Sequence, residues 1–128
     1  MDNSDWHYVK NKKDVDDLMA ASWGFHYSVL ANIKYLKKEH YDDPTRIQIL
    51  FTGCWECSIL LEFERDVLLH FISNDDNSCE ILDSNIIFDN GFVYWIDEYI
   101  KDVSELNDEY TYIKGRSLKW KMITEEDG

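Results

Sequence analysis

The run from Ser84 to Asp97, which reads S-N-I-I-F-D-N-G-F-V-Y-W-I-D, constrains the fold more than any other segment. Two arms rich in β-branched and aromatic residues flank its central Asp89-Asn90-Gly91. Asn and Gly tolerate the positive φ angles at the two central positions of a type I′ turn, whose twist matches the strands it joins. We therefore expect a β-hairpin here, within a mostly antiparallel sheet.

Alternation of apolar and polar residues with a period of two predicts further strands, and the short connections between them favour antiparallel neighbours. Val29, Ala31, Ile33 and Tyr35 form one such alternation. The last two strands are expected to pair as a hairpin across Gly115-Arg116. The predicted strands cover about residues 5–10, 26–36, 46–52, 58–64, 67–72, 79–88, 92–97, 110–114 and 117–123.

One segment, residues 14–23, has the pattern of an amphipathic helix. Asp14 can cap its N-terminus, Leu18 and Met19 share its apolar face, and Gly24 can end it. The fold class that follows is α+β, with about seven or eight short antiparallel strands and this helix packed on the sheet, or with the sheet curled into a half-barrel. A chain of 128 residues fits one domain, residues 1–128.

The chain carries a formal net charge of −13. This charge repels nucleic acid and anionic membranes and attracts basic partners. No apolar run approaches the ~18 residues of a membrane span, and no signal-like apolar segment opens the chain. We therefore expect a cytoplasmic protein. The three cysteines are an odd number, which disfavours a secreted disulfide framework.

Patterns that would support catalysis or metal binding are weak. Cys54 and Cys57 form a C-x-x-C, but an extended segment would place them on opposite faces, so neither zinc nor a redox pair is expected. His70 reads as a histidine satisfied within a sheet. Glu62 and Glu64 could act as an acid–base pair only if one of them is buried. Residues 74–77 lack the glycine and the terminal glutamate of a calcium loop. We predict no catalytic residue, no cofactor and no metal.

The distribution of charge is more informative than these motifs. Residues 73–109 hold eleven carboxylates against Lys101 alone, a local net charge of −10, whereas residues 110–124 carry +4. A solvated strand face explains this pattern without a partner. The alternative is a docking surface for a basic protein, with aromatic side chains as anchors. The candidate partner-binding residues are Tyr94, Trp95, Asp97, Glu98, Tyr99 and Asp102.

Six short segments carry familiar motifs: Trp6 to Lys10, Asp14 to Met19, Gly24 to Val29, Cys79 to Ser84, Tyr94 to Asp97 and Ser117 to Lys121. In this order they resemble a group of small uncharacterised bacterial proteins, found mainly in Gram-positive bacteria. The group has F-H-D-S where this chain has Phe25-His26-Tyr27-Ser28, so a role of that aspartate does not transfer. The F-H-D-S motif of that group also resembles immunity proteins that neutralise bacterial toxins. This second resemblance implies an acidic, cytosolic, β-rich protein.

We therefore expect a non-enzymatic module that binds a basic protein, acting as an immunity or accessory protein. The alternative is a half-barrel that binds a small ligand or acts as an enzyme, with an aromatic pocket at Trp55, Trp95 and His26. A deep concave site with converging polar groups would favour the pocket, and a flat acidic face would favour the protein partner. The sequence does not determine the oligomeric state.

Overall fold

The structure is a computed structural model that describes residues 6–22, 25, 28–54, 57–72 and 84–124. Within these ranges the chain forms one α-helix and nine strands in two antiparallel sheets, which confirms the predicted α+β class. The elements are β1 (His7–Tyr8), α1 (Lys12–Ser22), β2 (Val29–Leu36), β3 (Arg46–Cys54), β4 (Cys57–Glu64), β5 (Leu68–His70), β6 (Asn85–Asp89), β7 (Phe92–Ile96), the 3-10 turn η3 (Val103–Glu105), β8 (Tyr112–Gly115) and β9 (Ser117–Thr124).

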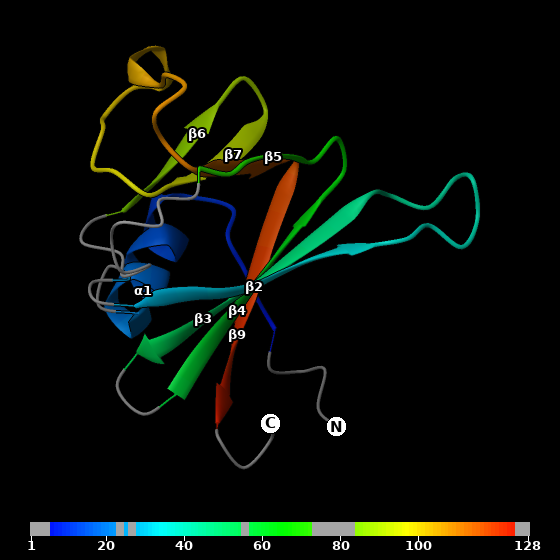
Figure 1. Ribbon diagram of the computed structural model, residues 1–128, viewed down its shortest axis with the longest axis horizontal. Coiled ribbons are helices and arrows are strands. Elements are labelled where there is room, and N and C mark those ends of the chain that lie inside the picture. Colours follow the sequence, from blue (N-terminus) through cyan, green and yellow to red (C-terminus); the bar gives the residue numbers. More distant parts are fainter. Residues whose placement is uncertain (1–5, 23–24, 26–27, 55–56, 73–83, 125–128) are drawn as a thin grey trace.

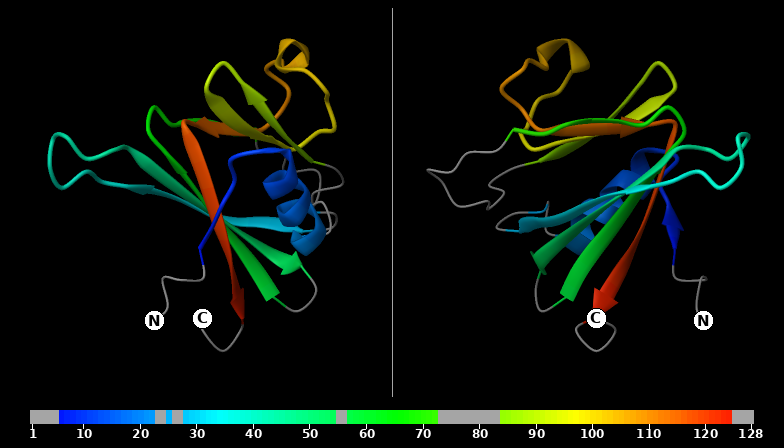
Figure 2. Two further views of the ribbon diagram at one scale, coloured as in Figure 1. Left: turned by 180° about the vertical axis from the view of Figure 1, so that it is seen from behind. Right: turned by 45° about the vertical axis from the view of Figure 1, so that its right-hand side comes forward.

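The two sheets pack against each other at an angle, without closing into a barrel (Figure 1). The five-stranded sheet has the order β1-β9-β4-β3-β2, and the four-stranded sheet has the order β5-β8-β7-β6. Helix α1 lies on the open side between them (Figure 2). The core therefore forms between the inner faces of the two sheets and the helix.

Helix α1 begins two residues before the predicted start. The cap is Asn11, whose Oδ1 accepts the Asp14 backbone N–H at 3.0 Å, while Asp14 accepts the Lys10 N–H at 2.9 Å. Capping by Asp14 itself was therefore wrong. The predicted apolar face is confirmed, because Leu18 is fully buried and Met19 is half-buried against the core. Gly24, the predicted stop, lies outside the described residues.

The Asn-Gly hairpin is confirmed as β6 and β7. Asp89 pairs with Phe92, and the two central residues have positive φ angles, 51° at Asn90 and 81° at Gly91. These are the left-handed conformations that a type I′ turn requires.

The predicted hairpin across Gly115-Arg116 is wrong. Strand β8 pairs with β5 and β7 in one sheet, whereas β9 pairs with β1 and β4 in the other, so the chain passes between sheets at this point. A Cβ at Gly115 would lie 3.1 Å from the Phe63 Cβ and 3.2 Å from the Glu64 carbonyl oxygen. Glycine is needed here for close packing at the corner, where the Arg116 N–H donates to the Glu64 carbonyl at 2.9 Å.

Strand β2 departs from strict alternation at a β-bulge. Its pairing with β3 passes from Leu30 directly to Asn32, which leaves Ala31 exposed and unpaired. Leu30 and Ile33 therefore both pack against the core, three residues apart. A single inserted residue of this kind reverses the face on which each following side chain lies.

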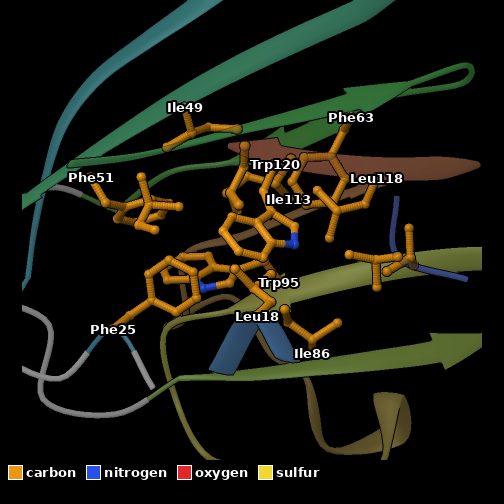
Figure 3. Packing of buried hydrophobic residues seen from close by; sticks show 14 of the residues in the cluster. Leu18, Phe25, Ile49, Phe51, Phe63, Ile86, Trp95, Ile113, Leu118 and Trp120 are labelled. Atoms are coloured by element: carbon orange, nitrogen blue, oxygen red, sulfur yellow. The ribbon is translucent and has the colours of Figure 1, made fainter. Parts of the chain in front are cut away.

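The centre of the core is a group of three aromatic rings, Phe25, Phe51 and Trp95, all fully buried (Figure 3). The Trp95 ring centroid lies 5.0 Å from that of Phe51 and 5.9 Å from that of Phe25. A second apolar cluster covers the outer face of the four-stranded sheet around Tyr94 and Ile96. This sheet is thus buried on both faces. The loop that covers its outer face, over the second cluster, is the first candidate site.

Candidate functional site

The segment that joins β7 to β8, residues 97–110, is here called the acidic loop. It holds six carboxylates against Lys101 and lies over the outer face of the four-stranded sheet. Its own apolar residues form its underside: Ile100 is buried beside Tyr94 and Ile96, with Val103, Leu106 and Tyr110 packed against them.

Hydrogen bonds fix both ends and the middle of the acidic loop. The Asp97 N–H donates to the Thr111 carbonyl at 3.0 Å, and the Thr111 N–H donates back to Asp97 Oδ1 at 3.1 Å. Asn85 Nδ2 donates to the Ile100 carbonyl at 2.7 Å. Asp102 Oδ1 caps η3 by accepting the Ser104 N–H at 2.9 Å. The loop is therefore a supported surface, built on the sheet beneath it.

The exposed residues of the acidic loop include five carboxylates and one aromatic side chain. Tyr99 is 58% exposed. The neighbouring exposed carboxylates are Glu98, Asp102, Glu105, Asp108 and Glu109. Asp97 is half-buried, and the pKa of its carboxyl is raised overall. Burial is the largest cause and the charge of Glu98 adds to it, while the hydrogen bond from the Thr111 N–H acts in the opposite direction. Four of the six predicted partner-binding residues, Asp97, Glu98, Tyr99 and Asp102, thus lie together.

Tyr94 and Trp95 do not belong to this surface. Trp95 is fully buried in the core, and Tyr94 is 7% exposed beneath the acidic loop. The reason is that β7 is covered on both faces, so its run Phe92–Ile96 is apolar without alternation. That missing alternation is the sequence signal that the prediction overlooked. Trp55 and His26, the other residues of the predicted pocket, lie outside the described residues.

A second polar group lies on the outer face of the five-stranded sheet and is here called the Glu62 cluster. Strand pairing places Lys34, Gln48, Glu62, Lys119 and Tyr8 in one row across the five strands. The Glu62 side chain is only 3% exposed. The buried carboxylate is the feature that sequence reasoning could not establish.

The carboxylate of Glu62 is surrounded by donors but incompletely bonded. Gln48 Nε2 donates to Oε1 at 2.8 Å. The other oxygen, Oε2, lies 3.8 Å from Arg46 Nη1 and 3.7 Å from Lys119 Nζ and has no hydrogen-bond donor among the described residues. Burial raises the pKa of the nearby Glu64 carboxyl, the Glu62 side chain raises it further, and the Lys119 ammonium lowers it.

Aromatic rings complete the surroundings of Lys119. Its Nζ lies 4.7 Å from the centroid of Trp6, 5.6 Å from that of Tyr8 and 3.9 Å from Glu64 Oε2. An ammonium between ring faces and carboxylates is held by cation–π and ionic attraction together. Glu62 and Glu64 meet the burial condition for an acid–base pair, but Lys119 lies between these carboxylates and the two rings. The carboxylates of the Glu62 cluster are therefore paired with the ammonium group of Lys119.

The remaining candidates have structural surroundings. His70 Nδ1 donates to the Tyr110 carbonyl at 2.8 Å and its ring lies against Tyr112, which confirms a satisfied sheet histidine. Strand pairing places Cys54 at the end of β3 opposite Cys57 at the start of β4, so the two cysteines lie on two paired strands and not on one extended segment. Residues 74–77 are not described. Within the described part of the chain, no three His, Cys, Asp or Glu side chains are grouped to hold a metal ion.

Comparisons with protein-family models, curated proteins and solved structures find no match to this chain. Among the described residues, no helix is long and apolar enough to cross a membrane.

Proposed function

We propose that this chain is a non-enzymatic binding module that recognises a basic protein through the acidic loop and serves as an immunity or accessory protein. The observation that carries the proposal is one exposed aromatic side chain, Tyr99, on the same loop as five exposed carboxylates, with the loop packed on the sheet beneath it. An aromatic anchor inside a charged rim is the composition of many protein-binding surfaces.

Support from below matters for affinity. Ordering a loop on binding costs free energy, and a loop that is already ordered avoids that cost. Ile100 at 6% exposure and the bonds to Thr111 and Asn85 hold the acidic loop in place before a partner arrives. The carboxylates then serve mainly to accelerate association and to exclude acidic proteins.

The test is affinity capture with the purified chain at low salt, followed by quantitative mass spectrometry. The loop variant carries Glu98→Lys, Asp108→Lys and Glu109→Lys, which reverses exposed charges and keeps the Asp102 cap. The control variant carries Asp16→Lys, Glu39→Lys and Asp42→Lys, with the same change in net charge at exposed positions elsewhere.

We expect one basic protein to be retained by the native chain and by the control variant, and lost with the loop variant. An immunity role further requires that this protein is a toxin that the chain inhibits. Equal loss with both variants, or retention by the loop variant, would show that the acidic loop is not the binding surface.

A further inference from the structure

The outer face of the five-stranded sheet is the other large surface whose chemistry calls for a partner. Helix α1 and the four-stranded sheet lie on its inner side, and the described chain places no helix or strand over the outer side (Figure 2). Half-buried Leu50 and Leu60 lie in its middle, and Tyr8 at its edge is 51% exposed.

The charge on this face differs in sign from that of the chain. Lys34, Arg46, Lys119 and Lys121 occur there with Glu62 and Glu64, in a chain of net charge −13. Two copies of such a chain repel each other over most approaches. On this face the local charge is slightly positive and both signs are present, so the repulsion is weakest there.

We propose that this face is an interface for a second copy of the same chain, in a closed two-fold dimer. A two-fold contact repeats every pair twice, so it requires a patch that complements itself. Exposed Lys34 on β2 and partly exposed Glu64 on β4 supply opposite charges on one face. In the dimer Lys34 of each copy pairs with Glu64 of the other, around the apolar middle at Leu50 and Leu60.

The buried carboxylate adds an independent observation. Glu62 is 3% exposed, and its Oε2 has no hydrogen-bond donor within the described chain. A buried oxygen without a donor costs stability, so the single chain leaves a polar group on this face incompletely satisfied. The acidic loop, which carries six carboxylates and one lysine, offers no such complementarity to itself.

This inference does not depend on the proposed function, because the acidic loop lies on the outer side of the other sheet. Sedimentation equilibrium from about 1 to about 500 μM is the test, over a range in which weak dimers form. We expect the molecular mass to rise from monomer to dimer and stop there.

Charge exchange identifies the surface. Lys34→Glu or Glu64→Lys alone should weaken the dimer about tenfold or more, and the double variant should recover most of the loss because it restores the opposite-charge pair. The controls Lys101→Glu and Glu98→Lys make the same changes in net charge on the acidic loop and should leave dimerisation unchanged. Circular dichroism confirms that each variant is folded.

A monomer at every concentration would overturn the proposal, as would growth into larger open assemblies. So would a dimer to which the charges at positions 34 and 64 make no difference, because another surface would then be responsible. Since Lys34 is exposed, its variant remains informative even where Glu64→Lys fails to fold.

Discussion

Among single residues, Asp97 shows how one part of the acidic loop is held by hydrogen bonds while its neighbour is exposed to solvent. Its carboxylate accepts the Thr111 N–H from a half-buried position, while the neighbouring Glu98 is exposed. Burial raises the pKa of the Asp97 carboxyl, so the folded chain binds this proton more tightly than the unfolded chain does. The charged form therefore lowers stability at pH 7.

This sign gives a pH-dependent prediction. Asp97→Asn keeps an Oδ1 acceptor for the Thr111 N–H and removes the buried charge, so the variant should be more stable than the native chain at pH 7. The difference should disappear as the pH falls below about 3.9, where the side chain is protonated in both states. Urea unfolding at several pH values measures it. A native chain more stable than Asp97→Asn at pH 7 would contradict the argument.

Lys119 has the reverse role, because it neutralises buried charge. Among the described residues, Lys119→Met leaves the buried Glu62 with Arg46 as its remaining cation, and the variant should lose about 3 kcal/mol of unfolding free energy. Lys12→Met removes the exposed pair with Asp16 at 2.9 Å and should cost below about 1 kcal/mol. Denaturant unfolding compares the two variants. Equal losses would mean that the Glu62 cluster does not stabilise the chain.

Among elements, the β6–β7 turn depends most directly on backbone conformation. Gly91 has a φ of 81°, and an added Cβ would meet only the flexible end of Arg116, at 3.0 Å from Nη1. Backbone strain therefore dominates the effect of substitution. Gly91→Val should cost about 1 kcal/mol or more, and Gly91→Asn clearly less, because asparagine tolerates a positive φ. Equal losses for the two variants in thermal unfolding would contradict this account.

The elements also show which features of the fold could be predicted from sequence. The Asn-Gly turn and the apolar face of α1 are local features, and both were predicted correctly. The passage of residues 112–124 from one sheet to the other was missed, because Gly115 is needed for its contact with Phe63, which is distant in sequence. The burial of Tyr94 was missed for a similar reason, since the cluster around Ile100 that covers it lies in a polar segment.

For the candidate sites, the sequence indicated where the charged residues lie but did not indicate which of them are buried. The carboxylates of the acidic loop are evident in the sequence, and Tyr99 is exposed, as the proposed anchor has to be. Glu62 and Glu64 alternate along β4 as solvated side chains would, yet Glu62 is buried. Its burial follows from the row of side chains contributed by Gln48 and Lys119 on neighbouring strands, and strand order is not a local property of the sequence.

In the whole molecule, the two candidate surfaces lie on the outer faces of two sheets that share one core. The acidic loop covers one sheet and the Glu62 cluster lies on the other. A dimer formed through the five-stranded sheet would leave both acidic loops exposed. Two loops could then bind two sites on one partner or on an assembly of partners, which raises the apparent affinity without any new contact.

The last prediction separates the charges of the acidic loop from its aromatic anchor in binding kinetics. Exposed rim charges act at long range, so raising the salt concentration from about 50 to about 500 mM should slow association with the partner about tenfold or more, with a smaller effect on dissociation. Tyr99→Ala should instead accelerate dissociation about thirtyfold, as expected for an anchor that contributes about 2 kcal/mol. Surface plasmon resonance measures both rates. Tyr41→Ala is the matched control, because Tyr41 is 93% exposed on the β2–β3 connection, away from the loop. Association that is insensitive to salt, or equal effects of the two tyrosine substitutions, would show that binding does not use the acidic loop in this way.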